Sequence, residues 1–350
     1  MTQMTNIYQR LYLQTADLQF DSFDDLYTAT FREEGASQTR WIPPANLYAT
    51  VHQGRLIFKI TGDRGYELND WSFAQLCTYL NADRGVIERL SVETAAQVLS
   101  EIFPHGDRPL QIYTVGSTIR SIHPISYERL PNSSVLEVVV DEATHLTEYR
   151  DQTIKLPAFF MGERDMFAYL IDESAWLVYR EERFAPAFVI WNSEVGARSV
   201  GIRSGWYHAG TKGFMLDDTS DPIGYSRRHS FGVNEALSVI RGRIHLWHAT
   251  TDSRCERFLD QLSQSKSQQF AESHDAMKTK LQRQGVCKPL TKAIEKCLTQ
   301  SSRTLSCFEV ALAILSAAQA VPFAATRFEL GQVSGSLITD RTRKNVPANC

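Results

Sequence analysis

The sequence predicts an α+β fold, in which a curved, mainly antiparallel sheet with helices on one face precedes a helical C-terminal segment. Three observations lead to this prediction. Alternating apolar residues, which are typical of strands, recur between residues 54 and 216. Runs with apolar residues at helical spacing interrupt these strands. Beyond Ala249 the composition changes to polar stretches whose apolar residues fall at helical intervals.

Length and composition place the chain among globular proteins. It has 350 residues, of which 43% are hydrophobic and 22% charged, so a sizeable core is expected and wholesale disorder is not. We expect four parts: an N-terminal extension (residues 1–50), an α+β core domain (51–250), a helical C-terminal segment (251–330) and a flexible tail (331–350).

The first half of the core domain begins with a strand over residues 54–60, where apolar residues alternate around a lysine. A helix capped by Asn69 or Asp70 follows, and a second helix starts at Ser91. Residues 110–122 predict two strands around a turn at Gly116. The stretch after residue 132 has a helix-start signal, but its β-branched run VLEVVV leaves helix and strand both open.

The second half of the core domain is dominated by strands. Residues 167–179 predict a hairpin, and residues 188–191 a further strand. The next pair is expected over residues 199–207 and 211–216, with a glycine at the turn. A helix over residues 230–241 closes the domain.

The C-terminal segment is expected to pack against the sheet or to extend from it. Gly285 and Pro289 divide residues 253–300 into two helices. Residues 306–321 predict a third helix that is more apolar and therefore more buried.

Charge is distributed unevenly along the chain. Residues 1–240 carry 21 Lys and Arg against 31 Asp and Glu, a balance of −10, whereas residues 241–350 carry 16 against 9, a balance of +7. A basic third on an acidic body indicates an anionic partner, although helices with solvated Lys and Arg would show the same balance.

Cysteine usage and hydropathy indicate the compartment. The six cysteines form no CxxC pair, which argues against a zinc ribbon and favours free thiols in a reducing cytosol. The first residues lack the basic and apolar regions of a secretory signal. The most apolar run, residues 310–323, is too short to span a bilayer. We therefore expect a cytoplasmic protein without a membrane partner.

A basic and aromatic stretch between residues 198 and 231 is the candidate binding site. Arginines that neutralise phosphate beside aromatics that stack on bases are typical of proteins that bind single-stranded nucleic acid. A sheet with one core face and one solvated face would give the same pattern. The predicted nucleic-acid-binding residues are Arg198, Arg203, Tyr207, Lys212, Arg227 and Arg228, and Trp206, Phe214, Tyr225 and Phe231 lie between or beside them.

Histidines offer a weaker, metal-binding alternative. His245 and His248 would share one side of a helix but would lie on opposite faces of a strand. His229, or Asp217 or Asp218, would supply a third ligand. The sequence contains no phosphate-binding glycine loop and no nucleophile elbow. We therefore assign no catalytic residue and no cofactor.

Four segments of the chain resemble the domain-of-unknown-function family 932 of phage and plasmid-like proteins. The most specific are IRSIHPISYERLPN and NSEVGARS, within the longer segments STIRSIHPISYERLPNSSVLEVV and FVIWNSEVGARSVGI. The others are RGYELNDWSFAQLCTYLN and FELGQVSGSLI. The chain departs from the family where HAGTKG replaces a Cys-x-Asn-Gly turn. The resemblance implies a protein of a mobile genetic element in the bacterial cytoplasm, without implying an activity.

The leading hypothesis is therefore a non-enzymatic nucleic-acid-binding protein of a phage or plasmid that acts in DNA replication or recombination. Its expected partner is single-stranded DNA, and homo-oligomerisation is left open. One alternative is a metal-dependent nuclease or hydrolase that uses His229, His245 and His248. Another is a protein–protein module that targets a host system.

Overall fold

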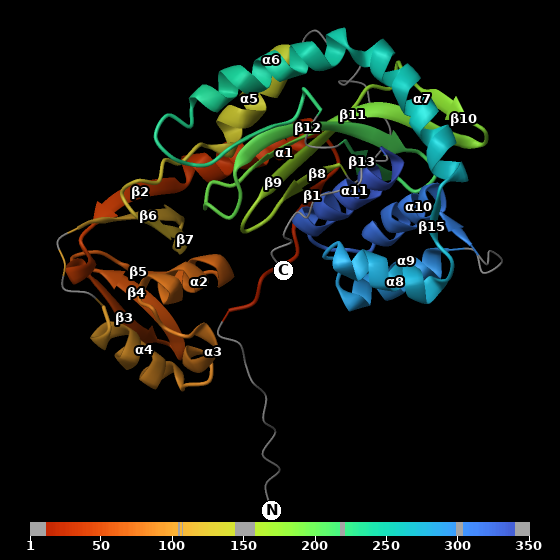
Figure 1. Cartoon of the computed structure of the whole chain (residues 1–350). Coiled ribbons are helices and arrows are strands. Elements are labelled where there is room, and N and C mark those ends of the chain that lie inside the picture. Colours follow the sequence, from red (N-terminus) through yellow and green to blue (C-terminus); the bar gives the residue numbers. More distant parts are fainter. Residues whose placement is uncertain are drawn as a thin grey trace, which may run out of the picture.

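The computed structural model describes residues 12–103, 106, 108–143, 158–217, 221–298 and 304–339. It confirms an α+β fold with mainly antiparallel sheets and a helical C-terminal segment. The strands between residues 51 and 250 belong to two sheets, however, and not to one. Figure 1 shows the two sheets side by side, with the C-terminal helices against the larger one.

The larger sheet has eight strands, all antiparallel to their neighbours. Its main path runs β1-β8-β9-β11-β12-β13, while β10 pairs with β11 and β14 with β12. The strands are β1 (Leu18–Phe20), β8 (Phe159–Met161), β9 (Met166–Ile171), β10 (Leu177–Tyr179), β11 (Glu182–Asn192), β12 (Val200–His208), β13 (Gly213–Leu216) and β14 (Tyr225–Arg227).

The smaller sheet has six strands in the order β2-β6-β7-β5-β4-β3. Only β5 and β7 pair in parallel among its described strands. The strands are β2 (Ser37–Ile42), β3 (Leu47–His52), β4 (Arg55–Ile60), β5 (Gly65–Leu68), β6 (Leu110–Val115) and β7 (Thr118–His123). A short 3₁₀ turn (Pro44–Asn46) precedes β3.

The helices α2 (Asp70–Tyr79), α3 (Arg84–Ile87) and α4 (Val92–Glu101) pack against the smaller sheet. Phe73 and Leu76 of α2 and Leu99 of α4 lie in one apolar cluster with residues of β3 to β7. Asn69 caps α2 in a reciprocal capping box with Ser72, so this predicted cap is confirmed.

Helices cover both faces of the larger sheet. On β11, Phe188 and Trp191 point to opposite faces because successive side chains alternate along a strand. The Phe188 ring packs 4.9 Å from Trp247 of α6 (Glu235–Ala249), and the Trp191 ring packs 4.9 Å from Phe328 of α11 (Ala324–Ile338). The first face also carries α1 (Phe23–Gly35), α5 (Asn132–Ala143), which packs on α1 and α6, and α7 (Thr251–Ser267).

The remaining C-terminal helices lie on the α11 side of the larger sheet (Figure 1). They are α8 (His274–Arg283), α9 (Lys288–Cys297) and α10 (Cys307–Ala318). A two-stranded sheet pairs β15 (Gln269–Ala271), which precedes α8, with β16 (Leu305–Ser306), which precedes α10. The expected packing of the C-terminal segment against the sheet is thus observed.

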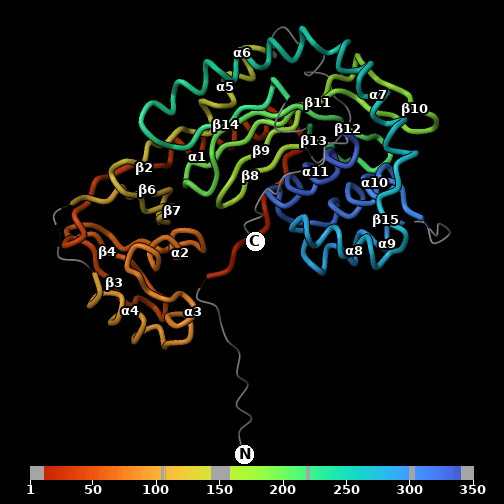
Figure 2. Tube along the Cα trace, viewed as in Figure 1, coloured from red at the N-terminus to blue at the C-terminus, as the bar shows by residue number. Residues whose placement is uncertain are grey.

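Several expected boundaries differ from the structure. The strands β1, β2 and β3 place the expected N-terminal extension in both sheets, and Asp17 accepts a hydrogen bond from the Ala324 N–H at 2.7 Å, which brings the first strand next to α11 (Figure 2). The expected hairpin over residues 167–179 does not form, because β9 and β10 each pair with β11. The last helix of the core domain begins at Glu235 and not at residue 230.

The expected flexible tail also needs correction. Residues 331–338 form the second half of α11, in which Ser334, Leu337 and Ile338 are buried. Their small and polar residues suggested fraying, but small residues let this helix approach the sheet closely. Residues 340–350 lie outside the described part of the chain. Within the described ranges, no helix has the length and apolar composition needed to cross a membrane.

Candidate functional site

Two of the predicted arginines lie between the larger sheet and α11. The Arg198 guanidinium is 3.6 Å from an Asp165 carboxylate oxygen and 3.4 Å from one of Glu329. Arg198 and Arg203 both lie over the Phe328 ring, at 5.4 and 5.7 Å. These contacts engage both arginines within the protein, and α11 covers the face on which a nucleic acid was expected.

Tyr207 and Lys212 are also unsuited to a shared binding surface with the other predicted residues. Tyr207 is 4% exposed and packs against Trp176 and Phe214, so its ring is not open to a base. Lys212 is exposed, in the turn between β12 and β13. Arg227 pairs with Val200 at the opposite end of β12, eight residues from His208 and therefore about 27 Å away along the strand.

The structure does keep Arg227 and Arg228 together, at the start of an exposed loop. We call residues 228–234, which join β14 to α6, the Phe231 loop. Arg228 is exposed, and Phe231 is 94% exposed. Arg227 donates to Glu235 at 2.9 Å and to the Phe231 carbonyl at 3.4 Å. Arg227 therefore holds the loop, while Arg228 and Phe231 remain open to solvent.

The Phe231 loop is anchored at several points. Glu128 accepts a hydrogen bond from the Gly232 N–H at 2.7 Å and one from the Asn234 amide at 3.1 Å. His229 is buried and stacks on Tyr127 with 5.6 Å between ring centroids. Val233 is fully buried. The exposed Phe231 thus lies on a loop that hydrogen bonds to Glu128, stacking on Tyr127 and the buried Val233 hold in place.

The anchoring residues Tyr127 and Glu128 belong, with Arg129, to a segment that also contacts the loop after β11, at Ser193 and Glu194. The Tyr127 hydroxyl lies 3.2 Å from the Ser193 carbonyl and 2.9 Å from that of Glu194. Arg129 donates to the Glu194 carboxylate at 3.0 Å. Residues 127–129 therefore connect the loop after β11 to the Phe231 loop.

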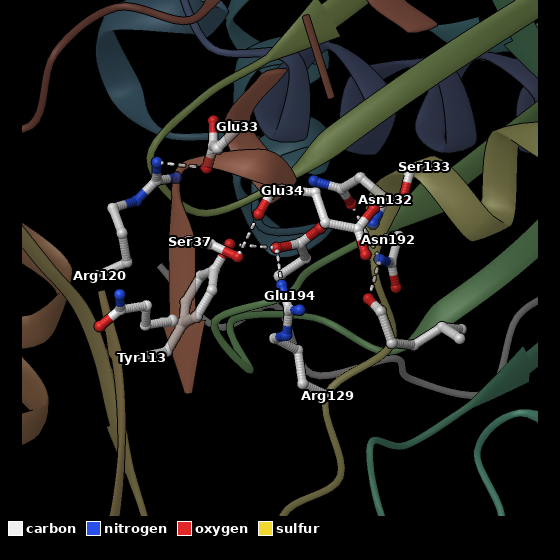
Figure 3. A network of polar contacts seen from close by, with 12 residues as sticks. Glu33, Glu34, Ser37, Tyr113, Arg120, Arg129, Asn132, Ser133, Asn192 and Glu194 are labelled. Atoms are coloured by element: carbon white, nitrogen blue, oxygen red, sulfur yellow. Dashed lines mark hydrogen bonds and ion pairs between the residues drawn. The ribbon is translucent and has the colours of Figure 1, made fainter. Parts of the chain in front are cut away.

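Glu194 is the centre of a buried polar network, drawn in Figure 3 between Tyr113 and Arg129. Its carboxylate accepts from the Tyr113 hydroxyl at 2.6 Å, from Arg129 and from the Asn132 N–H at the start of α5. Burial, followed by the Glu194 charge, raises the pKa of Tyr113. The carboxylate is fully engaged, so its role is to join β6, α5 and the end of β11.

A second set of contacts surrounds this network. Arg120 of β7 pairs with Glu33 at the end of α1, and the Ser133 hydroxyl donates to Glu34. On the other side of the smaller sheet, the Trp71 indole donates to the Val195 carbonyl at 2.8 Å. Together these bonds fix the smaller sheet to the larger one.

Sequence reasoning missed Tyr113 and Glu128, and it missed the partners of Glu194. The two segments with the most specific resemblance, IRSIHPISYERLPN and NSEVGARS, contact one another here through Tyr127, Arg129 and Glu194. The available signal was a charged residue three positions after the apolar run FVIW, because a carboxylate so close to a buried strand needs partners. Those partners could not be predicted, because they lie more than 60 residues before Glu194 in the chain.

The three candidate metal-binding histidines are engaged separately. His229 stacks on Tyr127, His245 pairs with Glu142 at 2.9 Å, and His248 packs against the Trp247 ring. Asp217 binds Arg254 at 2.6 Å, while Asp218 lies outside the described residues. Among the residues that the structure describes, no group of three or more His, Cys, Asp or Glu side chains is placed to hold a metal ion.

No protein-family model, curated protein or solved structure matches the chain. The resemblance to family 932 therefore stays an expectation.

Proposed function

We propose that the chain binds single-stranded nucleic acid through the Phe231 loop. The proposal includes its sequence-derived setting: a non-enzymatic, cytoplasmic member of family 932 that acts in phage or plasmid DNA replication or recombination. One observation carries it: Phe231 is 94% exposed on an anchored loop, beside the exposed Arg228. No comparable observation favours a metal-dependent hydrolase or a protein–protein module.

The side chains of Phe231 and Arg228 together suit an unstacked nucleotide, which has a base to stack and a phosphate to neutralise. A base that stacks on an aromatic ring contributes about 1–3 kcal/mol to binding, whatever its sequence. The anchors at Glu128 and Tyr127 fix the loop before binding, which lowers the entropy lost when a ligand orders it. Arg228 is the neighbouring cation available to phosphate, because Arg227 is paired with Glu235.

Binding of a fluorescent oligothymidine, measured by anisotropy over a range of salt concentrations, tests the proposal. Phe231→Ala is expected to weaken binding about fivefold or more, which corresponds to the lower end of the stacking range. Arg228→Gln is expected to reduce the slope of log affinity against log salt by about 0.7. Thermal unfolding should be unchanged in both variants, because both side chains are exposed.

Matched controls are Phe31→Ala, which removes another exposed phenylalanine on α1, and Arg89→Gln, which removes another exposed arginine. Both should bind as the wild type does. The proposal is overturned if the wild type does not bind the oligonucleotide at low salt, or if Phe231→Ala binds with unchanged affinity.

A further inference from the structure

The helices α8 and α9 form a compact helical hairpin. Four residues, 284–287, separate them, and Gly285 among them adopts a φ of 89° that favours glycine. Met277 and Leu281 of α8 and Ile294 of α9 are fully buried in one apolar cluster with α10. The apolar side of this hairpin therefore anchors it on α10.

The second helix of this hairpin carries a line of lysines. Lys288, Lys292 and Lys296 are all exposed and follow one another at intervals of four residues. At about 100° per residue they fall within about 80° of arc, and the centre of the buried side lies about 130° away. Residues 274–298 contain six Lys and Arg and two Asp and Glu, so their balance is 6 − 2 = +4.

Internal pairing leaves these lysines unopposed. Glu295 is the one acidic residue of α9, and it accepts from Lys278 of α8 at 3.1 Å and lies 3.5 Å from His274. Within the described part of the chain, no ion pair joins Lys288, Lys292 or Lys296 to a carboxylate. The hairpin is therefore held together by its apolar side and by Glu295.

The three lysines lower the stability of α9, the helix that carries them. Like charges four residues apart destabilise a helix by about 0.2–0.5 kcal/mol per pair, and α9 has two such pairs. Lys288 is also the first residue of α9, where the helix dipole disfavours a cation. A local arrangement that opposes the stability of its own element is expected at functional sites.

We propose that α9 binds duplex DNA, with its lysines on phosphates at the edge of the major groove. A helix of 10 residues is about 15 Å long and, with its side chains, about 10–12 Å across, which fits a major groove about 12 Å wide. The lysines follow one another by about 6 Å along the helix axis. Arg283, exposed at the end of α8, adds a further cation beside the turn.

The same residues predict how the duplex is recognised. Contacts from lysine to phosphate position a protein on DNA without reading its sequence. The sequence of α9, KPLTKAIEKC, contains no Arg, Asn or Gln, and its three exposed lysines are the residues that we place on phosphates. Duplex binding by α9 is therefore expected to depend strongly on salt and weakly on base sequence. This site is independent of the Phe231 loop.

The test uses the full chain and a fluorescent 20-base-pair duplex, with anisotropy measured between 50 and 200 mM salt. Three phosphate contacts give a slope of log affinity against log salt of about −2.7, which means a loss of about 40-fold over this range. The variant K288Q/K292Q/K296Q should lose this salt dependence and bind weakly throughout. It should remain folded because all three side chains are exposed.

A charge-matched control separates the site from the net charge of the protein. R32Q/R55Q/R89Q removes three exposed cations elsewhere and should bind the duplex as the wild type does. Phe231→Ala should also keep duplex binding, and the α9 variant should keep its affinity for oligothymidine, so the two sites succeed or fail separately.

Three outcomes overturn the duplex site. The first is that the α9 variant binds the duplex with wild-type affinity and slope. The second is that the charge-matched control loses as much affinity as the α9 variant. The third is that the wild type binds an RNA duplex or an unstructured single strand through α9 more tightly than the DNA duplex.

Discussion

His229 of the Phe231 loop forms a stack with Tyr127 and His123. The ring centroids of His123 and Tyr127 are 3.6 Å apart, and those of Tyr127 and His229 are 5.6 Å apart. Burial lowers the pKa of each histidine to about 4. Both rings are therefore neutral at pH 7, and protonation would place a charge in the buried stack.

These shifts predict a loss of stability in mild acid. In the unfolded chain a histidine has a pKa of about 6.5, so the unfolded state takes up its proton first as the pH falls. The stability that each neutral histidine gives to the folded protein is fully present above about pH 6.5 and declines between about pH 6.5 and pH 4. At pH 5 each histidine is expected to have lowered the free energy of unfolding by about 2 kcal/mol relative to neutral pH.

His229→Phe tests this expectation, because phenylalanine can stack on Tyr127 but cannot take up a proton. Urea unfolding at pH 7 and pH 5 should show that the variant loses about 2 kcal/mol less than the wild type over this interval. An equal loss in both proteins would mean that His229 is not the titrating group.

At the residue scale, the sequence predicts which residue types are available but not which of them are exposed. Arg198, Arg203 and Arg228 look equivalent in the sequence, yet only Arg228 is exposed. The difference arises from α11, which lies more than 120 residues away in the chain. Its Glu329 pairs with Arg198, and its Phe328 ring packs against Arg203. Phe231 could be named from the sequence, but its 94% exposure could not.

At the scale of elements, α11 shows how small residues determine packing. A Cβ atom added at Gly335 would lie 1.9 Å from the Leu216 carbonyl oxygen of β13. The helix backbone thus approaches the strand more closely than a side chain would allow. The sequence predicted a flexible tail from residue 331 because many residues there are polar, and it gave no sign of this packing.

Gly335→Ala is therefore expected to destabilise the protein by about 3 kcal/mol, because overpacking forces the helix away from β13. The matched control is Gly242→Ala at an exposed position of α6, where an added Cβ meets nothing within 4 Å. That change should stabilise the protein by about 0.5–1 kcal/mol through helix propensity. Urea unfolding of both variants checks the prediction, and equal stability of Gly335→Ala and wild type would contradict it.

Elements with local signals could be predicted well. The cap at Asn69, the turn at Gly116, the pairing of β12 with β13 and the turn between α8 and α9 all depend on neighbouring residues. The division into two sheets could not be predicted, because it depends on which strands pair. The sequence of residues 177–179 gives no sign that this strand pairs with β11 and not with β9.

At the scale of the whole molecule, the two proposed surfaces lie on different sides of the larger sheet. The Phe231 loop leads into α6 on one face, whereas α9 packs with α8 and α10 on the α11 side of the sheet (Figure 1). The network around Glu194 and the packing of α11 hold these parts in one arrangement. A nucleic acid that contacts both surfaces must therefore pass around the edge of the sheet.

This arrangement predicts how affinity depends on the length of a single-stranded tail. A duplex bound at α9 presents its tail to Phe231 only when the tail is long enough to span the two sites. Once it spans them, the second contact becomes intramolecular, and affinity can rise by about 10²–10⁴-fold without a new contact. We expect little gain for short tails, a rise at a threshold length and a slow decline for longer tails.

Anisotropy measurements with duplexes that carry tails of increasing length check this expectation. In Phe231→Ala the rise should disappear and leave the affinity of the blunt duplex. In K288Q/K292Q/K296Q every tailed duplex should bind as weakly as a single strand of the same length. If tailed duplexes of all lengths bind the wild type no more tightly than the blunt duplex, the two surfaces do not act on the same molecule, because a fixed arrangement of two sites must favour a ligand that spans them.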